Sequence, residues 1–284
     1  MRGWLWGRRA NSCQLRPWLD MKPLSSWPLN ARQKIVGVFT DIDDTLTTEG
    51  AITPDALQAL HNLKAAGLMV IPITGRPVGW SMPFASTWPV DAMVAENGSV
   101  ALVHNAQTNQ VSKIYQQDST TRTRNYQEMQ RIAKRVVEEI PSTLMTQDSP
   151  GRETDIAFDH SEFHHLSQEQ FQQVLKLLKE EGMTATVSSI HINAWFGDHN
   201  KWHGAKWILK ELTDRDLSQE LDQWVYVGDS TNDQIMFEHF THSVGVANIR
   251  RFEHELTHLP KYIATQKRGA GFAELANALL QPAL

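Results

Sequence analysis

Three aspartates stand close together in the sequence FTDIDDT: Asp41, Asp43 and Asp44. They follow the run 35–39, which is rich in β-branched residues and typical of a central parallel strand covered on both faces. Carboxylates this close repel one another, so a fold that gathers them needs a cation, a proton or solvent to offset their charge. Ligand sites in open α/β sheets lie beyond the carboxyl ends of the strands, where Asp41 and Asp43 would stand. The alternative is a solvated acidic turn, because Asp is common in turns.

Three more polar segments stand where a predicted strand ends or a predicted helix begins. Thr74 ends the apolar run 68–74, Lys201 begins a helical pattern, and the segment GDSTND (228–233) ends the run 223–229. Because the carboxyl ends of parallel strands meet at one edge of a sheet, we expect these segments to join the acidic segment there.

The residue types of these segments suit phosphoryl chemistry. Carboxylate oxygens from Asp41 and Asp229 suit Mg²⁺, which prefers oxygen ligands and keeps several waters. A hydroxyl from Thr74 and an ammonium from Lys201 suit the non-bridging oxygens of a phosphoryl group. The sequence therefore predicts a site at which Mg²⁺ and a phosphoryl group meet.

The elements that position these residues alternate between strand and helix. We expect one strand in each of five segments, with helical patterns between them: 34–40, 68–74, 91–97, 223–229 and 242–248. Thr53 and Pro54 predict the start of the first of these helices, and Gly67 predicts its end. Such alternation predicts an α/β fold with a doubly wound, Rossmann-like parallel sheet.

The alternation stops between Gly98 and Phe196, where we expect an inserted α+β cap domain. Residues 34–97 and 197–284 would then form the catalytic core. The elements expected within 98–196 are a hairpin (99–104 and 111–117), helices over 119–140 and 167–182, a strand over 154–159, and either two strands or one long bent strand over 184–196.

Residues 1–33 differ from the rest of the chain, since tryptophans alternate with arginines and prolines there. We expect a disordered or loosely attached tail, with Met21 as a second candidate for the true start. Cys13 is the single cysteine, which excludes an intramolecular disulfide and favours a reducing, cytoplasmic compartment. The net charge of −5 gives no electrostatic case for nucleic acid or an anionic membrane, and no apolar run is long enough to span a bilayer.

The motifs DIDDT, ITGRP, Lys201 and GDSTND resemble, in order, the four motifs of haloacid dehalogenase superfamily phosphatases. The resemblance covers residues 34 to 265, and the size and place of the insert resemble the branch with a large α/β cap after the third strand. That branch includes the Cof-type sugar phosphatases, sucrose-phosphate phosphatase and mannosyl-phosphoglycerate phosphatase. Two residues depart from the pattern: Asp44 and Ser230 stand where Gly is common in the family.

The resemblance implies a role for each matched residue. Asp41 would attack phosphorus to form an aspartyl-phosphate, and Asp43 would protonate the leaving group and then activate water. Mg²⁺ would be held by Asp41, the backbone carbonyl of Asp43 and Asp229, with Asp233 bound to it or close by. The phosphoryl and substrate oxygens would be held by the remaining motif residues, which are Thr74, Gly75, Arg76, Lys201 and Asn232.

The cap is expected to recognise the leaving group. Over 189–194 polar and apolar residues alternate, which places Ser189, His191 and Asn193 on one face of a strand. If that face looks toward the phosphoryl site, its neutral donors and acceptors would suit sugar or polyol hydroxyls. The alternative is a solvent-facing side of a half-exposed sheet. Arg152, in a cap loop, is a candidate clamp for a substrate phosphate or carboxylate, or a solvated surface residue.

Three functions remain open from the sequence. The first is a Mg²⁺-dependent phosphatase acting on a small phosphorylated metabolite such as a sugar phosphate. The second is a phosphomutase of the same fold, which would need to bind two phosphates. The third is a catalytically silent phosphoacceptor or binding module, against which the second carboxylate, Asp43, and the large cap both argue. The sequence predicts neither the oligomeric state nor the identity of the leaving group.

Overall fold

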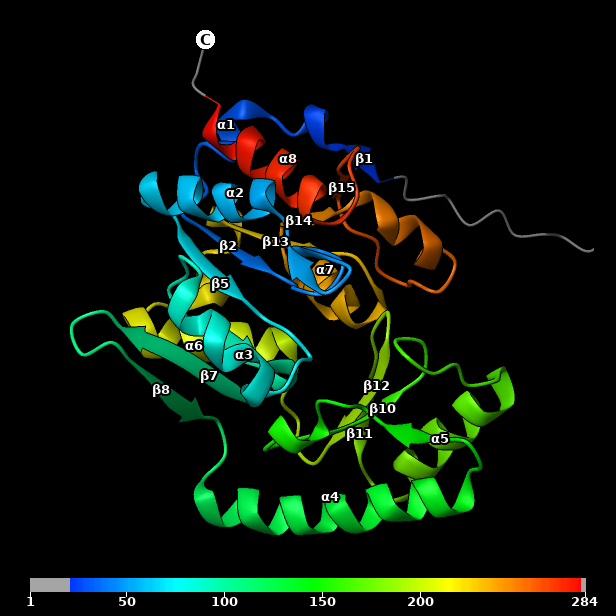
Figure 1. Cartoon of the computed structure of the whole chain (residues 1–284). Helices are drawn as coiled ribbons and strands as arrows, with labels where there is room; N and C mark the ends of the chain where they lie inside the picture. The colour runs from blue at the N-terminus through cyan, green and yellow to red at the C-terminus, as the bar shows by residue number, and fades with distance from the viewer. Residues whose placement is uncertain (1–20, 282–284) are drawn as a thin grey trace, which may run out of the picture.

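The computed structural model describes residues 21–281, which form a core with a smaller unit beneath it (Figure 1). A six-stranded sheet in the order β1-β15-β14-β13-β2-β5 lies at the centre of the core. All five neighbouring pairs are parallel. The strands are β1 (Lys22–Pro23), β2 (Gly37–Thr40), β5 (Met69–Pro72), β13 (Trp224–Gly228), β14 (His242–Gly245) and β15 (Tyr262–Ile263). The predicted doubly wound parallel sheet is therefore confirmed.

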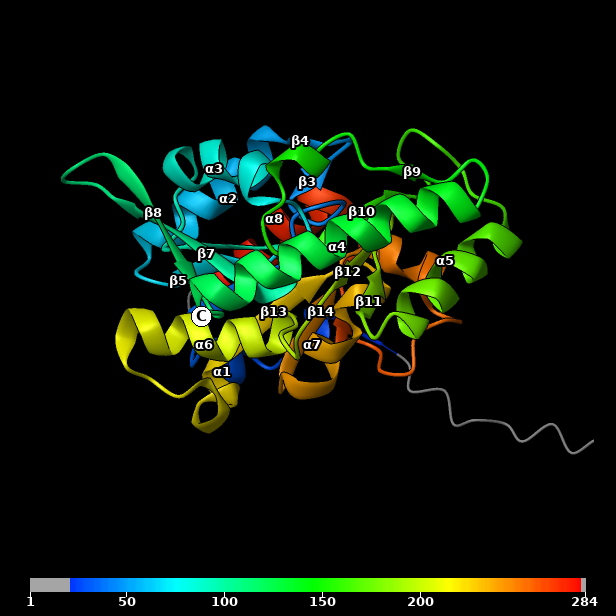
Figure 2. The ribbon, with the colours of Figure 1, turned by 90° about the horizontal axis from the view of Figure 1, so that it is seen from below.

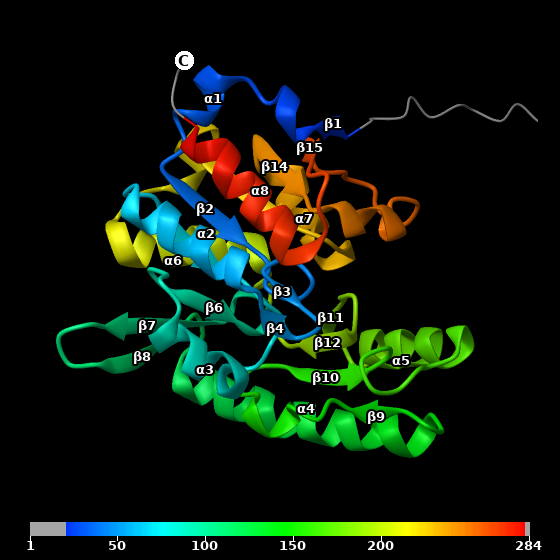
Figure 3. The same cartoon turned by 45° about the horizontal axis from the view of Figure 1, so that its top comes forward.

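Helices cover both faces of this sheet because its strands are apolar on both sides. Val38 and Val70 pack with α2 (Pro54–Ala65) and α8 (Arg268–Leu280), which lie in front of the sheet in Figure 3. Phe39, Ile71 and Tyr226 point to the opposite face, as the period of two requires. That face is covered by α6 (Lys201–Thr213) and α7 (Gln234–His239). The carboxyl ends of β2, β5 and β13 consequently open at one edge of the core.

Short elements complete the core around these layers. They are η1 (Leu24–Ser26), α1 (Leu29–Arg32), β3 (Thr47–Thr48), β4 (Ala51–Ile52), α3 (Val78–Thr87), η2 (Glu96–Gly98), η4 (Leu217–Gln219), η5 (Leu221–Gln223), η6 (Thr231–Asp233) and η7 (Ala247–Phe252). Within the described residues, no helix is both long and apolar enough to cross a membrane.

The hairpin expected at the start of the cap belongs instead to the core. Strands β6 (Met93–Ala95), β7 (Val100–Asn105) and β8 (Gln110–Tyr115) form an antiparallel sheet. A parallel bridge between Ile73 and Val94 joins this sheet to the end of β5. Val100 and Leu102 are fully buried among core side chains, so the hairpin buries its apolar residues there. We therefore propose that the cap begins after the hairpin, at about residue 118, and not at residue 98.

The cap is a four-stranded antiparallel sheet in the order β11-β12-β10-β9, with two helices on one face. Its elements are α4 (Ser119–Glu139), β9 (Leu144–Met145), η3 (Ser149–Gly151), β10 (Ile156–Asp159), α5 (Gln168–Glu180), β11 (Thr184–Val187) and β12 (His191–Trp195). Figure 2 shows α4 and α5 on the side of the cap away from the core. The segment 184–196 forms two strands, and the capping box of Ser167 and Gln170 is present.

The stretch 21–33 is part of the folded core, which corrects the expected loose tail for these residues. Lys22 and Pro23 pair with β15 at the edge of the central sheet. Leu24 and Trp27 are buried, and Trp27 stacks on Tyr262 with ring centroids 5.3 Å apart. Burial of each of these two large apolar side chains stabilises the attachment of this stretch by about 1.5–3 kcal/mol. Residues 1–20, including Cys13, lie outside the described residues.

Candidate active site

Three buried carboxylates meet at the carboxyl edge of the sheet. Asp41 follows β2, Asp229 follows β13, and Asp233 ends η6 in the same loop. One oxygen of each lies within 4.8 Å of the others. Lys201, the first residue of α6, donates from Nζ to Asp41 Oδ1 and to Asp233 Oδ1, each at 2.7 Å. The structure thus brings together the residues that the sequence placed at separate strand and helix ends.

The carboxylates differ in how many hydrogen bonds they accept from the protein. Asp233 Oδ2 accepts from the backbone amides of Asp229 and Ser230, at 2.9 and 3.1 Å. Its Oδ1 accepts from Lys201 and from the hydroxyl of Tyr226. Asp233 therefore holds the GDSTND loop closed on itself, while Asp41 has, within residues 21–281, a single side-chain donor, the Lys201 ammonium.

Burial and mutual repulsion raise the proton affinity of this cluster. Burial raises the pKa of Asp41 to about 8, although Lys201 lowers it, and Asp233 and Asp43 add to the rise. Burial, followed by the charges of Asp233 and Asp41, raises the pKa of Asp229 well above its usual value. Burial lowers the pKa of Lys201, but the two carboxylates outweigh it and the net shift is upward. The ammonium is therefore fixed in its charged form, and the cluster lacks positive charge.

A divalent cation fits the cluster. Three carboxylates and one ammonium carry a formal charge of −2, and the only other cation paired with them in the described residues is the half-exposed Arg251, 3.1 Å from Asp229. The ligand atoms are all carboxylate oxygens, which suit a hard cation such as Mg²⁺. Asp41, Asp229 and Asp233 are thus the residues that would hold it. The Asp43 side chain lies elsewhere, which leaves its backbone carbonyl as the ligand expected from the sequence.

Thr74 and the residues after it form the second part of the site. Thr74 is fully buried, and its Oγ1 accepts from the amide of Arg76 at 3.0 Å. A Cβ on Gly75 would stand 3.3 Å from the Asn97 side chain and 3.4 Å from that of Asn193. A side chain at position 75 would therefore require the Asn97 side chain to shift by a few tenths of an ångström.

Asp43 and Arg76 connect the core to the cap. Arg76 is buried, and its Nε and Nη2 lie 3.0 Å from the Asp43 carboxylate. The same guanidinium reaches Asp148 and Glu162 of the cap, at 3.3 and 2.9 Å. Burial lowers the pKa of Arg76, but Asp43 and Glu162 outweigh it and raise the pKa above its usual value. A permanent cation therefore holds the second aspartate of DIDDT and two cap carboxylates together.

Of the three cap residues predicted to share one strand face, His191 and Asn193 lie on β12 and Ser189 lies in the turn before it, and the side chains of His191 and Asn193 already have partners. His191 Nε2 lies 2.6 Å from Glu162 Oε2, and Asn193 donates to the carbonyl of Gly75 at 3.2 Å. Both side chains are buried, so β12 is not a solvent-facing strand. Ser189 lines the cleft described below. Asn232 accepts from the Ser230 hydroxyl within the GDSTND loop, at 2.9 Å.

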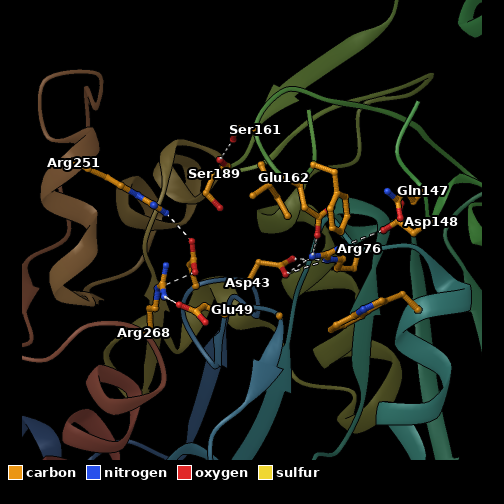
Figure 4. Close-up of a pocket in the computed structure, with 15 residues that line it drawn as sticks. Asp43, Glu49, Arg76, Gln147, Asp148, Ser161, Glu162, Ser189, Arg251 and Arg268 are labelled. Carbon is orange, nitrogen blue, oxygen red and sulfur yellow. Dashed lines mark hydrogen bonds and ion pairs between the residues drawn. The ribbon is translucent and has the colours of Figure 1, made fainter. Parts of the chain in front are cut away.

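A cleft of about 640 Å³ lies between core and cap above these groups (Figure 4). Asp43 and Arg76 form its floor, and Arg251 and Arg268 project from one side of the core. The cap residues that line the cleft are Gln147, Asp148, Ser161, Glu162, Phe163, Ser189 and Ile190. They contribute polar groups and one exposed aromatic ring, and none of them is a lysine or arginine.

Comparison with known proteins assigns the family. The sequence model of the haloacid dehalogenase-like hydrolases matches residues 38–164 and 108–274. The chain belongs to this family of hydrolases. A search of curated proteins gave no match.

Solved structures share the fold of this haloacid dehalogenase-like hydrolase at low sequence identity. A protein of Thermoplasma acidophilum is 17% identical, with a TM-score of 0.66 over 86% of this chain and 98% of that one. The sucrose-phosphatase of Synechocystis sp. PCC6803, solved with sucrose and phosphate, is 16% identical, with a TM-score of 0.61 over 86% and 97%. The C-terminal domain of trehalose-6-phosphate phosphatase from C. albicans is 13% identical, with a TM-score of 0.62 over 88% and 95%.

Several residues around the hydrolase site were not predicted from the sequence. Tyr226, inside β13, bonds to Asp233, and its position in an apolar strand gave no signal beyond packing. Asn248 donates to Asp229 Oδ2 at 2.8 Å and to the carbonyl of Asp44 at 3.0 Å. Its place just beyond a strand end was a signal that could have been used. Arg251 pairs with both Asp229 and Asp44, and nothing local in the sequence indicates this.

Proposed function

We propose that this hydrolase is a Mg²⁺-dependent phosphatase that removes the phosphoryl group from a small sugar phosphate or a related phosphomonoester through an aspartyl-phosphate. One observation carries the proposal: Asp41 lies in a buried cluster of carboxylates with Lys201, while Asp43 lies beside it in a different ion-pair environment. Two carboxylates in unlike surroundings can take unlike roles, one as nucleophile and one as acid and base.

The residues of the chain would share the reaction as follows. Asp41 attacks phosphorus and displaces the alkoxide, to which Asp43 gives a proton. Asp43 then takes a proton from the water that cleaves the aspartyl-phosphate. Thr74 and Lys201 hold the phosphoryl oxygens, with Gly75, Arg76 and Asn232 in the surrounding loops. When bound, Mg²⁺ would neutralise charge and align the reacting groups, held by Asp41, Asp229, Asp233 and the carbonyl of Asp43.

The cleft favours a neutral, hydroxylated leaving group. Its cap side offers the carboxylates of Asp148 and Glu162 and the hydroxyl groups of Ser161 and Ser189 as hydrogen-bonding groups. The ring of Phe163 is exposed and can pack against a sugar. A phosphomutase would bind a second phosphate, and the lack of a cation among the cap residues that line the cleft argues against it.

Phosphate release from a panel of phosphomonoesters, with Mg²⁺ and with EDTA, tests the proposal. Turnover in H₂¹⁸O should place the label in the inorganic phosphate. Under single-turnover conditions ¹⁸O from a labelled Asp41 should stay on the enzyme, because water attacks the phosphorus of the intermediate and the aspartate leaves with its own oxygens. Transfer between two positions of a bisphosphorylated sugar would indicate the mutase instead. Binding of phosphomonoesters without turnover, in Mg²⁺, would indicate the silent module.

A further inference from the structure

The segment Thr74–Arg76 presents three successive carbonyl groups, and the core backbone fixes only two of them. The carbonyl of Thr74 accepts from the amide of Asn97 at 2.9 Å, and that of Arg76 accepts from the amide of Glu96 at 3.0 Å. The carbonyl between them, that of Gly75, accepts its hydrogen bonds from cap side chains. The middle peptide of the proposed phosphate-binding segment thus depends on the cap.

Two buried donors from different parts of the cap converge on this carbonyl. Arg152 Nη1 lies 3.1 Å from Gly75 O, and Asn193 Nδ2 lies 3.2 Å from it. Asp155 accepts from both donors, through Oδ1 from Arg152 at 2.8 Å and through Oδ2 from Asn193 at 3.0 Å. The exposed fractions are 4% for Arg152, 1% for Asn193 and 0% for Asp155. The carboxylate therefore fixes the direction of both donors in the absence of solvent.

Holding this carbonyl also sets the amide on the other side of the same peptide. The carbonyl of Gly75 and the N–H of Arg76 belong to one planar unit and point in opposite directions. With the oxygen held by the cap, the Arg76 N–H points to Thr74 Oγ1, 3.0 Å away. The hydroxyl of Thr74 is thereby oriented, since it accepts one hydrogen bond and keeps its proton for another partner. A continuous series of hydrogen bonds, which passes through the Gly75–Arg76 peptide, therefore connects Asp155 to Thr74.

We propose that Arg152, Asp155 and Asn193 are positioning residues, through which the cap completes the phosphate-binding segment by fixing the Gly75–Arg76 peptide. The proposal rests on the proposed function only in taking Thr74 as a ligand of the phosphoryl group. It assigns Asn193 and Arg152 to the phosphoryl group common to all substrates, and not to the leaving group or to a second anion.

The hydrogen-bonding capacity of these side chains supports this assignment. The Asn193 amide has two N–H groups, and they donate to Gly75 O and to Asp155 Oδ2. Arg152 donates to Gly75 O, Asp155 and Asp148. A substrate that took one of these N–H groups would leave Asp155 or the Gly75 carbonyl without that donor in a buried place, which is costly. His191, the first residue of β12, pairs with Glu162, and Ser189, in the turn before β12, lines the cleft, so both remain candidates for leaving-group recognition.

Two variants test the proposal, with one control. Asn193→Ala removes one donor to Gly75 O and leaves the Arg152–Asp155 ion pair in place. Arg152→Met combined with Asp155→Leu removes the other donor together with its counter-ion, so that no buried charge is left alone. Tyr115→Phe is the control, because it removes a hydrogen bond from the core hairpin to Glu153, at 2.5 Å, without touching Gly75.

The measurements are the dissociation constant of inorganic phosphate in Mg²⁺ by calorimetry, and kcat and KM on p-nitrophenyl phosphate and on the best sugar phosphate. Asn193→Ala and the double variant should each weaken phosphate binding and lower kcat/KM by about tenfold to a hundredfold, equally for both substrates. The control should stay within about twofold of the wild type, since its lost contact is partly exposed. Circular dichroism at the assay temperature confirms that each variant is folded.

Separate outcomes bear on the inference and on the proposed function. Loss on the sugar phosphate alone, with phosphate affinity unchanged, overturns the inference and makes Asn193 a leaving-group contact. A wild type that binds no phosphate, or variants that bind it as tightly as the wild type, also overturns it. A wild type that binds phosphate but hydrolyses no monoester refutes the proposed function, whereas weaker phosphate binding by Asn193→Ala would still support the inference.

Discussion

Replacing Lys201 by methionine should lower the melting temperature of the protein, because the negative charges of the buried carboxylates then lose their paired ammonium. In the part of the chain that the structure describes, the ammonium is the one side-chain donor to Asp41 and one of two to Asp233, and the Lys201 side chain is 2% exposed. Removing one partner of a buried ion pair costs about 3–5 kcal/mol. Since 1 kcal/mol shifts the melting temperature of a chain of this size by roughly 2–4 °C, we expect a loss of about 6–20 °C in metal-free protein at about pH 9.

The loss of melting temperature in Lys201→Met should become larger as the pH rises. The pKa of Asp41 is raised from 3.8 to about 8 in the folded protein. A carboxyl with a raised folded pKa contributes its full stability below the unfolded pKa, and this contribution disappears as the pH rises through about 8. Lys201 lowers the pKa of Asp41, so the substitution raises it further and deepens the loss. Asp41 is protonated in both folded proteins below about pH 7, so the difference in stability between variant and wild type should widen from about pH 7 to pH 9, and added Mg²⁺ should narrow it.

Thermal unfolding in EDTA and in Mg²⁺, at both pH values, measures these effects. Lys210→Met is the matched control, because Lys210 lies in the same helix and pairs with Asp214 on the surface, at 2.5 Å. The control should melt close to the wild type at both pH values. Turnover of Lys201→Met should fall by about 10²- to 10³-fold even where it is folded, since one phosphoryl donor is lost. Equal melting temperatures for Lys201→Met and wild type in EDTA at about pH 9 would refute the reasoning.

Three further substitutions test the assigned roles. Asp41→Asn keeps the shape of the side chain but removes the attacking charge, so turnover should fall to background with the fold intact; a variant that kept a tenth of wild-type activity would exclude the covalent route. Asp229→Asn should raise the Mg²⁺ concentration needed for half-maximal activity by at least about tenfold, measured by metal titration, because one ionic ligand is lost. Asp43→Asn should slow phosphorylation by a sugar phosphate more than by p-nitrophenyl phosphate, whose leaving group needs no proton; equal losses in single-turnover assays would count against its role as the acid.

Local patterns predicted the core strands and the positions of the four motif segments, because the type of each strand depends on interactions between residues close together in the sequence. The run 35–39 is apolar enough to be a buried strand, and the carboxyl ends of parallel strands necessarily share an edge. The same reasoning predicts that Asp41, Asp229 and Lys201 lie together, as they do. Thr53, Pro54 and Gly67 likewise marked the ends of α2, and Gly67 has a φ of +83°.

The errors arose where tertiary partners override the local pattern. Residues 21–33 contain prolines and no clear periodicity, yet Trp27 finds an apolar neighbour, Tyr262, more than two hundred residues away. The hairpin 100–115 carries the same alternation whether it packs on the core or on the cap, and only the partners of Val100 and Leu102 decide between them. Asn193 lies on a strand, as expected, but its two N–H groups are already bound to Gly75 and Asp155, which no spacing in the sequence could indicate.

The two aspartates of DIDDT differ in which part of the molecule controls them. Asp41 is held through Lys201 and lies beside Asp229 and Asp233, all of which belong to the core. Asp43 is held by Arg76, and that guanidinium is shared with two cap carboxylates. A displacement of the cap would therefore redistribute the contacts of the proposed acid and base while leaving those of the nucleophile in place. Since protonation depends on the identity of the leaving group, this division allows the cap to couple leaving-group recognition to proton transfer, while the ion pair of the nucleophile stays within the core.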